Sequence, residues 1–118
     1  VLTIIKMMPI CPVPHTADYI SGLINLRGQI IPVLDLAKRI TLADQVETSD
    51  QRIVVVEREK HLFGFIVDKV RSVVQIPVTK IKEPSRIITR VQEEYLSGIA
   101  ESEGDLVLLL GLERLLQR

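Results

Sequence analysis

The side chains most able to do chemistry in this chain are one cysteine, two histidines, several carboxylates at the ends of apolar runs, and an arginine at a tight turn. Cys11 and His15 stand four residues apart, as a thiol nucleophile and its general base could. Three prolines between residues 9 and 14 predict an extended loop, which holds no third group to orient the base. The pattern therefore favours a structural loop over a catalytic pair.

The carboxylates and the second histidine also have simpler explanations than catalysis. Asp35 and Asp68 each end an apolar run, and capping of nearby backbone N–H groups is favoured over paired acid–base work. His61 fits a turn between strands. Two histidines and one cysteine, widely separated, form no recognisable metal site, and neither GxGxxG nor a Walker sequence occurs. We therefore predict no catalytic residue, no metal and no cofactor.

Composition narrows the possible partners. Acidic and basic residues balance at 15 each, so no overall field attracts nucleic acid or an anionic membrane. Two tyrosines and two phenylalanines are poor material for base stacking, which leaves a small nucleic-acid-binding barrel as a less favoured alternative. No apolar run has the length of a membrane span, and a single cysteine fits a reducing compartment. We expect a cytoplasmic protein with no nucleic-acid partner and no direct insertion into a membrane.

The arginine lies in GLINLRGQIIPVLDL, residues 22–36, where Arg27 and Gly28 join two apolar runs. Strand alternation puts Asn25 and Arg27 on one face, and Ile24 and Leu26 on the other. Arg27 is either a solvated turn residue or a partner-binding residue at a rigid hairpin tip, where arginine is enriched. These residues alone leave both readings open.

An internal repeat bears on that question. Residues 19–36 match residues 95–112 at a constant offset of 76, with identities at Tyr19/Tyr95, Ser21/Ser97, Gly22/Gly98, Gly28/Gly104, Leu34/Leu110 and Leu36/Leu112. Residues 1–7 match residues 70–76 in the same order. Gly28 is kept as Gly104, whereas Glu103 stands at the position of Arg27. The turn therefore needs its glycine, and the arginine is not a folding requirement.

The repeat predicts the strands and their grouping. The second copy contains five expected strands, at 52–59, 62–68, 69–76, 97–102 and 105–111, and the first copy only three, at 1–8, 22–27 and 29–36. Short helices are expected near 37–40 and after residue 111. The resulting fold is mainly β, with two five-stranded barrels: lobe one at about 1–43, lacking its N-terminal hairpin, and lobe two at about 51–118. An open edge in lobe one would favour strand-swapped self-association. The glycines expected at structural turns are Gly22, Gly64, Gly98 and Gly104.

Three motifs in this order resemble the CheW-like domains of the bacterial chemotaxis coupling family: NLRG (25–28), GFIVDKV (64–70) and YLSG (95–98). The resemblance runs from Val1 to the C-terminus. It implies two intertwined SH3-like barrels, usually with a hairpin before the position of Val1. It also implies a non-enzymatic scaffold that binds the regulatory domain of a chemotaxis histidine kinase and the cytoplasmic hairpin tip of chemoreceptors, in membrane-associated receptor arrays. A regulatory-domain fragment of a larger kinase, or of an adaptor fused to a receiver domain, is the alternative.

The resemblance also implies roles for single residues. Asn25, Arg27 and Gly28 of the NLRG motif correspond to the receptor-facing region, and Val1 and Val70 to a receptor-binding region between the lobes. Gly22 matches the glycine that ends a short helix before this strand. Two departures are Thr3, where many relatives carry an acidic residue, and His15, which replaces a common asparagine.

Overall fold

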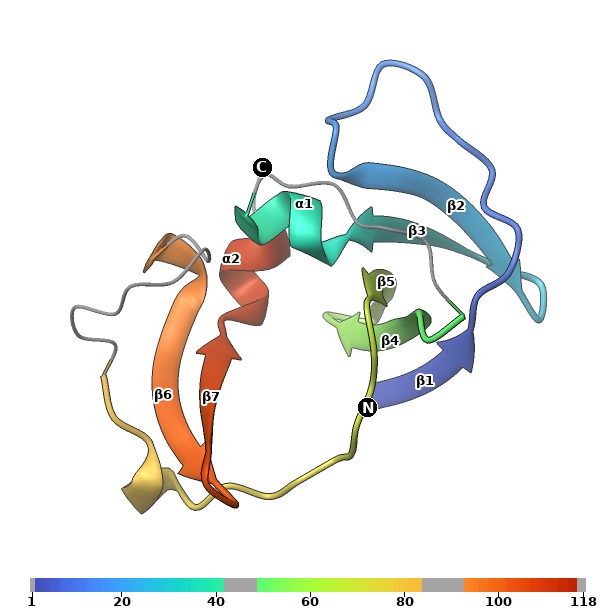
Figure 1. Ribbon diagram of the computed structural model, residues 1–118. Coiled ribbons are helices and arrows are strands. Elements are labelled where there is room, and N and C mark those ends of the chain that lie inside the picture. Colours follow the sequence, from blue (N-terminus) through green and yellow to red (C-terminus); the bar gives the residue numbers. More distant parts are fainter. Residues whose placement is uncertain (1, 42–48, 84–92, 117–118) are drawn as a thin grey trace. The chain divides into compact units, whose positions relative to one another are not determined.

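Short apolar runs become strands in the computed structural model, which describes residues 2–41, 49–83 and 93–116 (Figure 1). The elements are β1 (Leu2–Lys6), β2 (Ile20–Leu26), β3 (Gln29–Asp35), α1 (Leu36–Thr41), β4 (Arg52–Arg58), β5 (His61–Val67), η1 (Val78–Lys80), η2 (Glu93–Tyr95), β6 (Leu96–Ser102), β7 (Asp105–Leu110) and α2 (Leu112–Leu116). The predicted mainly β fold with short helices is confirmed. No helix in the described ranges is long and apolar enough to cross a membrane.

The chain forms two compact units, Val1–Arg71 and Ser72–Arg118. Unit 1 contains a five-stranded sheet with the order β1-β4-β5-β3-β2. Its neighbours pair antiparallel except β3 and β5, which run parallel. Beyond β1 the chain reaches the opposite edge, where Cys11 and Leu23 exchange two backbone hydrogen bonds of 2.9 Å. One segment therefore contacts both ends of the sheet.

The core of unit 1 comes from both copies of the repeat. It consists of β-branched side chains that are buried almost completely: Ile24, Ile31, Val33, Ile53, Val55 and Ile66. The first three lie on β2 and β3, and the other three on β4 and β5. Burial of such side chains stabilises the fold by about 1.5–3 kcal/mol each. The two copies are thus intertwined within one sheet.

The strand order in this sheet differs from the grouping into lobes that the repeat predicts. The sequence assigned 52–68 to lobe two and left lobe one with three strands, but β4 and β5 lie between β1 and β3. The boundary between the compact units, after Arg71, thus lies later than the predicted lobe boundary, and the missing N-terminal hairpin of lobe one stays a prediction. The apolar run of β4 predicts a buried strand, and Ile53 and Val55 are buried while Val54 and Val56 are half-buried. An apolar run of this kind does not specify which strands will pair with it.

The predicted strand at 69–76 is wrong. Residues 69–77 belong to no strand, and Val73 and Val74 are 74% and 48% exposed. A strand needs a ladder partner, and the described residues supply none for this segment. The match of 70–76 to β1 is therefore a match of sequence without a match of local structure.

The sheet of unit 2 reproduces the β2–β3 hairpin of unit 1. β6 and β7 pair with the register of β2 and β3 shifted by 76 residues, including a bulge before Gly98 that corresponds to the one before Gly22. Asp35 donates its backbone N–H to the Tyr19 carbonyl, and Gly111 donates to the Tyr95 carbonyl, at 2.8 and 2.9 Å. The repeat in the sequence is thus a repeat of hydrogen bonding. In the described part of unit 2 the sheet has two strands.

Candidate partner-binding site

The β2–β3 hairpin ends in a two-residue turn. Arg27 and Gly28 have φ values of 52° and 84°, which is the pattern of a type I′ turn with positive φ at both central residues. The Asn25 side-chain oxygen accepts a 3.0 Å hydrogen bond from the Gly28 N–H. Asn25, Arg27 and Gly28 are exposed, whereas Ile24 is buried in the core. The NLRG motif therefore forms an exposed hairpin tip that is closed by the Asn25–Gly28 hydrogen bond. The opposite face of its strand packs in the core through Ile24.

The β6–β7 hairpin has the same tip with the opposite charge. Glu103 and Gly104 have φ values of 51° and 82°, within two degrees of their counterparts. A left-handed conformation costs an L-residue about 1–2 kcal/mol, so neither charged residue is there for backbone preference. Because the geometry accepts Arg27 in one copy and Glu103 in the other, the choice of charge is independent of the turn. This exposed arginine is the candidate site.

Of the other two residues predicted to bind the receptor, only Val70 lies within the described residues. Val70 is half-buried and follows β5 by three residues, in the extended segment at the end of unit 1. Val1 lies outside the described residues. Thr3 is exposed on β1 opposite Val55 of β4. The roles of Val1 and Val70 stay predictions.

Three of the four glycines expected at turns lie within strands. Gly22 is not at the end of a helix but in β2, where φ is +146° and a Cβ would stand 2.2 Å from the Cys11 carbonyl oxygen. Gly98 occupies the matching place in β6, and Gly64 lies in β5, where a Cβ would meet Ile53 Cγ2 at 3.0 Å. Other segments of the chain pass so close to these three positions that a Cβ would crowd them. Of these four glycines only Gly104 occupies a turn tip, as Gly28 does in the first copy.

The residues considered for catalysis have structural surroundings. Cys11 is exposed and its thiol contacts the Pro12 carbonyl, while His15 sits in an exposed turn with φ of 62°. No interaction of the described chain joins the two. Asp35 precedes α1, and its carboxylate accepts a 3.1 Å hydrogen bond from the Lys38 N–H, so its predicted capping role is confirmed.

The second histidine and the second strand-end aspartate are both exposed. The sequence predicts His61 in the turn, but it begins β5 and is exposed. The turn is formed by Glu59 and Lys60, one residue earlier. Asp68 is exposed directly after β5. Within the described ranges no three His, Cys, Asp or Glu side chains gather as metal ligands would. Arg39 stacks on Tyr19 at 4.3 Å from the ring centre, which attaches α1 to the segment before β2.

Known proteins resemble this chain over its whole length. The family model for the CheW-like domain matches residues 1–118. A chemotaxis protein CheW from Treponema pallidum is 28% identical over 95% of this chain and 68% of its own length, and one from Thermotoga maritima is 29% identical over 97% and 74%. The crystal structure of the scaffolding protein TtCheW from Thermoanaerobacter tengcongensis superposes with a TM-score of 0.86, at 34% identity over 98% of this chain and 75% of that one.

Proposed function

The chain belongs to the CheW-like domain family, and on this premise we propose that it couples chemoreceptors to a chemotaxis histidine kinase. It is a non-enzymatic scaffold of the chemotaxis system. It therefore acts by binding partner proteins, and the structure must be asked which surfaces bind them. The proposed receptor contact is the tip of the β2–β3 hairpin.

The pair of matched hairpin tips is the observation that supports this contact. Arg27 is exposed, lies in a conformation that glycine would adopt at lower cost, and is replaced by glutamate in the other copy. A charge that the fold does not need is available to a partner. Its guanidinium offers five donors in a rigid fork, which suits carboxylates or backbone carbonyls at the end of a receptor hairpin.

The second proposed partner is the regulatory domain of the kinase, bound at the ends of the β-structure. We expect this association to depend on apolar contacts and to bury about 800 Å² on each partner, the usual scale of a specific interface. The two partners then occupy different surfaces of one scaffold. Neither would need a chemical step on this chain.

Direct binding tests the proposal. The 118-residue chain is immobilised and offered, separately, a kinase regulatory domain and a receptor cytoplasmic fragment from a bacterium whose CheW is similar. We expect both to be retained, and each to be released by excess free chain. If neither is retained, the coupling role is wrong for this chain. If only the kinase domain is retained, the kinase contact stands and the receptor contact falls.

We also propose that the isolated chain associates with itself through unit 2. Val73, Val74 and Val78 are 74%, 48% and 83% exposed, and Leu106 on β7 is 58% exposed. Exposed apolar side chains and the open edges of a two-stranded sheet both favour pairing with a second copy. Sedimentation velocity should show a larger species as concentration rises, and Val73→Lys should reduce it. A single monomeric species at every concentration would contradict this.

A further inference from the structure

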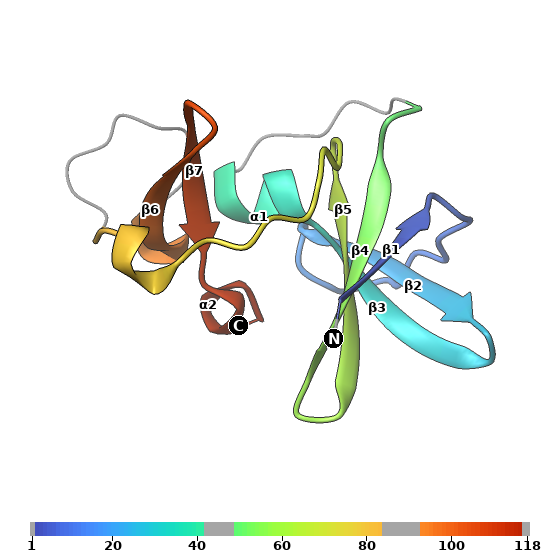
Figure 2. The ribbon, with the colours of Figure 1, turned by 90° about the horizontal axis from the view of Figure 1, so that it is seen from below.

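The place where β3 meets β5 is the weakest ladder of the five-stranded sheet. The two strands pair only through Val33–Asp35 and Gly64–Ile66. Pro32 directly precedes the paired stretch, and it has no N–H to continue the ladder. The hairpins β2–β3 and β4–β5 diverge toward their tips (Figure 2).

A cleft of about 360 Å³ lies between the diverging strands. It is lined by Gln29, Ile30 and Pro32 of β3 and by residues 60–63 at the start of β5. Residues 29–32 pair with β2 on their other edge, and residues 61–63 pair with β4 on theirs. Since the backbone groups of a strand point alternately to its two sides, each strand presents an unpaired edge to the cleft.

The charged groups that line the cleft are all basic. Its charged or chargeable lining residues are Lys60 and His61, and no acidic side chain lines it. Ile30 is 60% exposed within it, which is unusual for a large apolar side chain on a central strand. The cleft thus combines unpaired backbone donors and acceptors, an uncovered apolar side chain, and positive charge.

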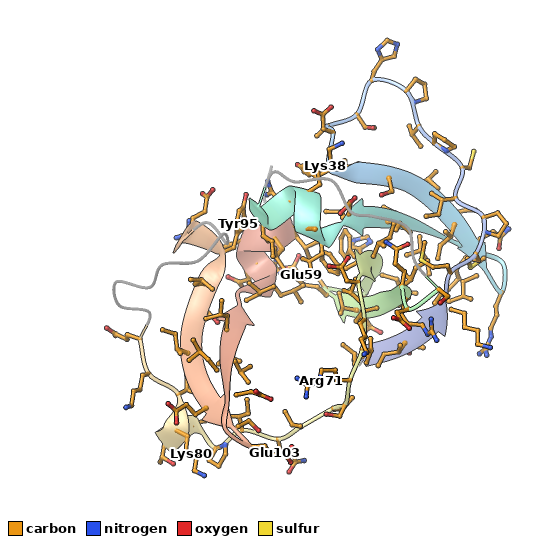
Figure 3. All side chains as sticks on the ribbon, viewed as in Figure 1. Lys38, Glu59, Arg71, Lys80, Tyr95 and Glu103 are labelled. Carbon is orange, nitrogen blue, oxygen red and sulfur yellow. The ribbon has the colours of Figure 1, made fainter. Side chains whose placement is uncertain are left out.

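Another cavity in the described residues differs in this respect. It belongs to unit 2, has a volume of about 530 Å³, and is lined by lysines and glutamates together, including Lys80 and Glu103 (Figure 3). The opposite charges on its walls balance one another. It therefore attracts neither sign of ligand, and it supplies a matched control for the cleft in unit 1.

We propose that the cleft between β3 and β5 binds an extended, acidic segment of a partner protein by strand addition. The backbone of the segment pairs with a free strand edge, an apolar side chain covers Ile30, and a carboxylate meets Lys60. The site goes beyond the coupling role assigned above, because it takes an extended peptide and does not involve Arg27. It can fail while receptor binding at the hairpin tip holds.

The probe is a blocked decapeptide of alternating valine and aspartate, compared with the same peptide carrying lysine for aspartate. Fluorescence anisotropy should show binding of the acidic peptide and at least roughly tenfold weaker binding of the basic one, since charge-assisted hydrogen bonds are lost. N-methylation of alternate amides in the acidic peptide should abolish binding, because it removes strand pairing. Amide chemical shifts should change at residues 29–32 and 60–63.

The decisive variant is Lys60→Gly. Lys60 has φ of 68°, so glycine removes a strained backbone position and should raise the melting temperature. We expect the affinity for the acidic peptide to fall roughly tenfold at the same time, as one charge-assisted contact is lost. Lys80→Ala, in the cavity of mixed charge, should leave that affinity unchanged.

Several results would overturn the proposal. Equal binding of the acidic and basic peptides would remove the charge argument. Shift changes confined to β1 or β7 would place strand addition at another edge. Binding of a single-stranded oligonucleotide that is lost with Lys60→Gly, without binding of the peptide, would assign the cleft to nucleic acid.

Discussion

Arg27 and Glu103 have nearly the same backbone conformation, with φ of 52° and 51°, and opposite charges. The two equivalent turns therefore show that this backbone conformation accepts either charge. The Asn25 side chain and the Gly28 N–H, which close the turn, do not involve the guanidinium. Stability and binding should accordingly separate at this one residue.

We predict that Arg27→Glu leaves the fold intact and removes receptor binding. The free energy of unfolding should change by about 0.5 kcal/mol or less, as for surface substitutions generally. Receptor-fragment affinity should fall sharply, because a donor fork becomes an acceptor facing the same surface. Kinase-domain affinity should stay near the parent value. Thermal melting and separate titrations measure these three quantities, and an unfolded variant or an unchanged receptor affinity would each refute the assignment.

Two glycines with positive φ should respond very differently to alanine. At Gly28 a Cβ meets nothing within 4 Å, so Gly28→Ala should cost only the backbone strain, about 1 kcal/mol. At Gly22 a Cβ would stand 2.2 Å from the Cys11 carbonyl oxygen. Gly22→Ala should therefore cost about 3–4 kcal/mol, from strain and displaced backbone together. Urea unfolding of both variants checks the difference, and equal costs would contradict it.

At the scale of elements, the β4–β5 hairpin is the central piece of unit 1. Ile53 is fully buried in β4, and it packs beside Gly64 of β5. Its neighbours in the core, Val33 and Ile31, come from the other copy of the repeat. The hairpin therefore joins strands that are far apart in the sequence.

We predict that Ile53→Ala destabilises the chain by roughly 3 kcal/mol, since it removes buried methyl groups and leaves a cavity. Val78→Ala is the control, because Val78 is 83% exposed, and its cost should stay below about 0.5 kcal/mol. Chemical unfolding followed by circular dichroism measures both. A small cost at Ile53 would mean that the hairpin is not part of the cooperative core.

The helix α1 shows what local sequence can settle at this scale. Asp35 ends β3 and caps the backbone N–H of Lys38, so one residue closes a strand and opens a helix. The capping pattern is visible in the sequence because the two residues are three positions apart. The strand at 69–76 failed for the opposite reason: its pattern was suitable, but a strand also needs a partner, which no local pattern supplies.

At the scale of the whole molecule, the two units differ in how much sheet they contain. Unit 1 has five strands around a buried cluster, while the described sheet of unit 2 is one hairpin with an added bridge between Lys82 and Ile99. Two-stranded hairpins are marginally stable alone, and three or more strands are needed for independent stability. Local opening should therefore be easier in unit 2.

We predict that backbone amides of β6 and β7 exchange with deuterium faster than those of β4 and β5, by roughly tenfold or more. Peptide-level mass spectrometry of the native chain compares the four strands directly. Protection of β6 and β7 as strong as that of β4 and β5 would show that unit 2 is as stable as unit 1. The exposed tips at Arg27 and Glu103 serve as the fast-exchanging reference.

The sequence by itself determined the repeat, the hairpins, the turn glycines Gly28 and Gly104, and the exposure of Arg27. These follow from alternation, turn chemistry and spacing, all of which act over a few residues. Only the tertiary structure decided that β4 and β5 enter the sheet of β1, β2 and β3, that the Cys11 segment passes close to Gly22, and that a cleft lies beside Pro32. A buried apolar strand gains nearly the same free energy from any well-packed neighbour, so its local pattern does not name the partner. That choice is made by the fit of the whole core.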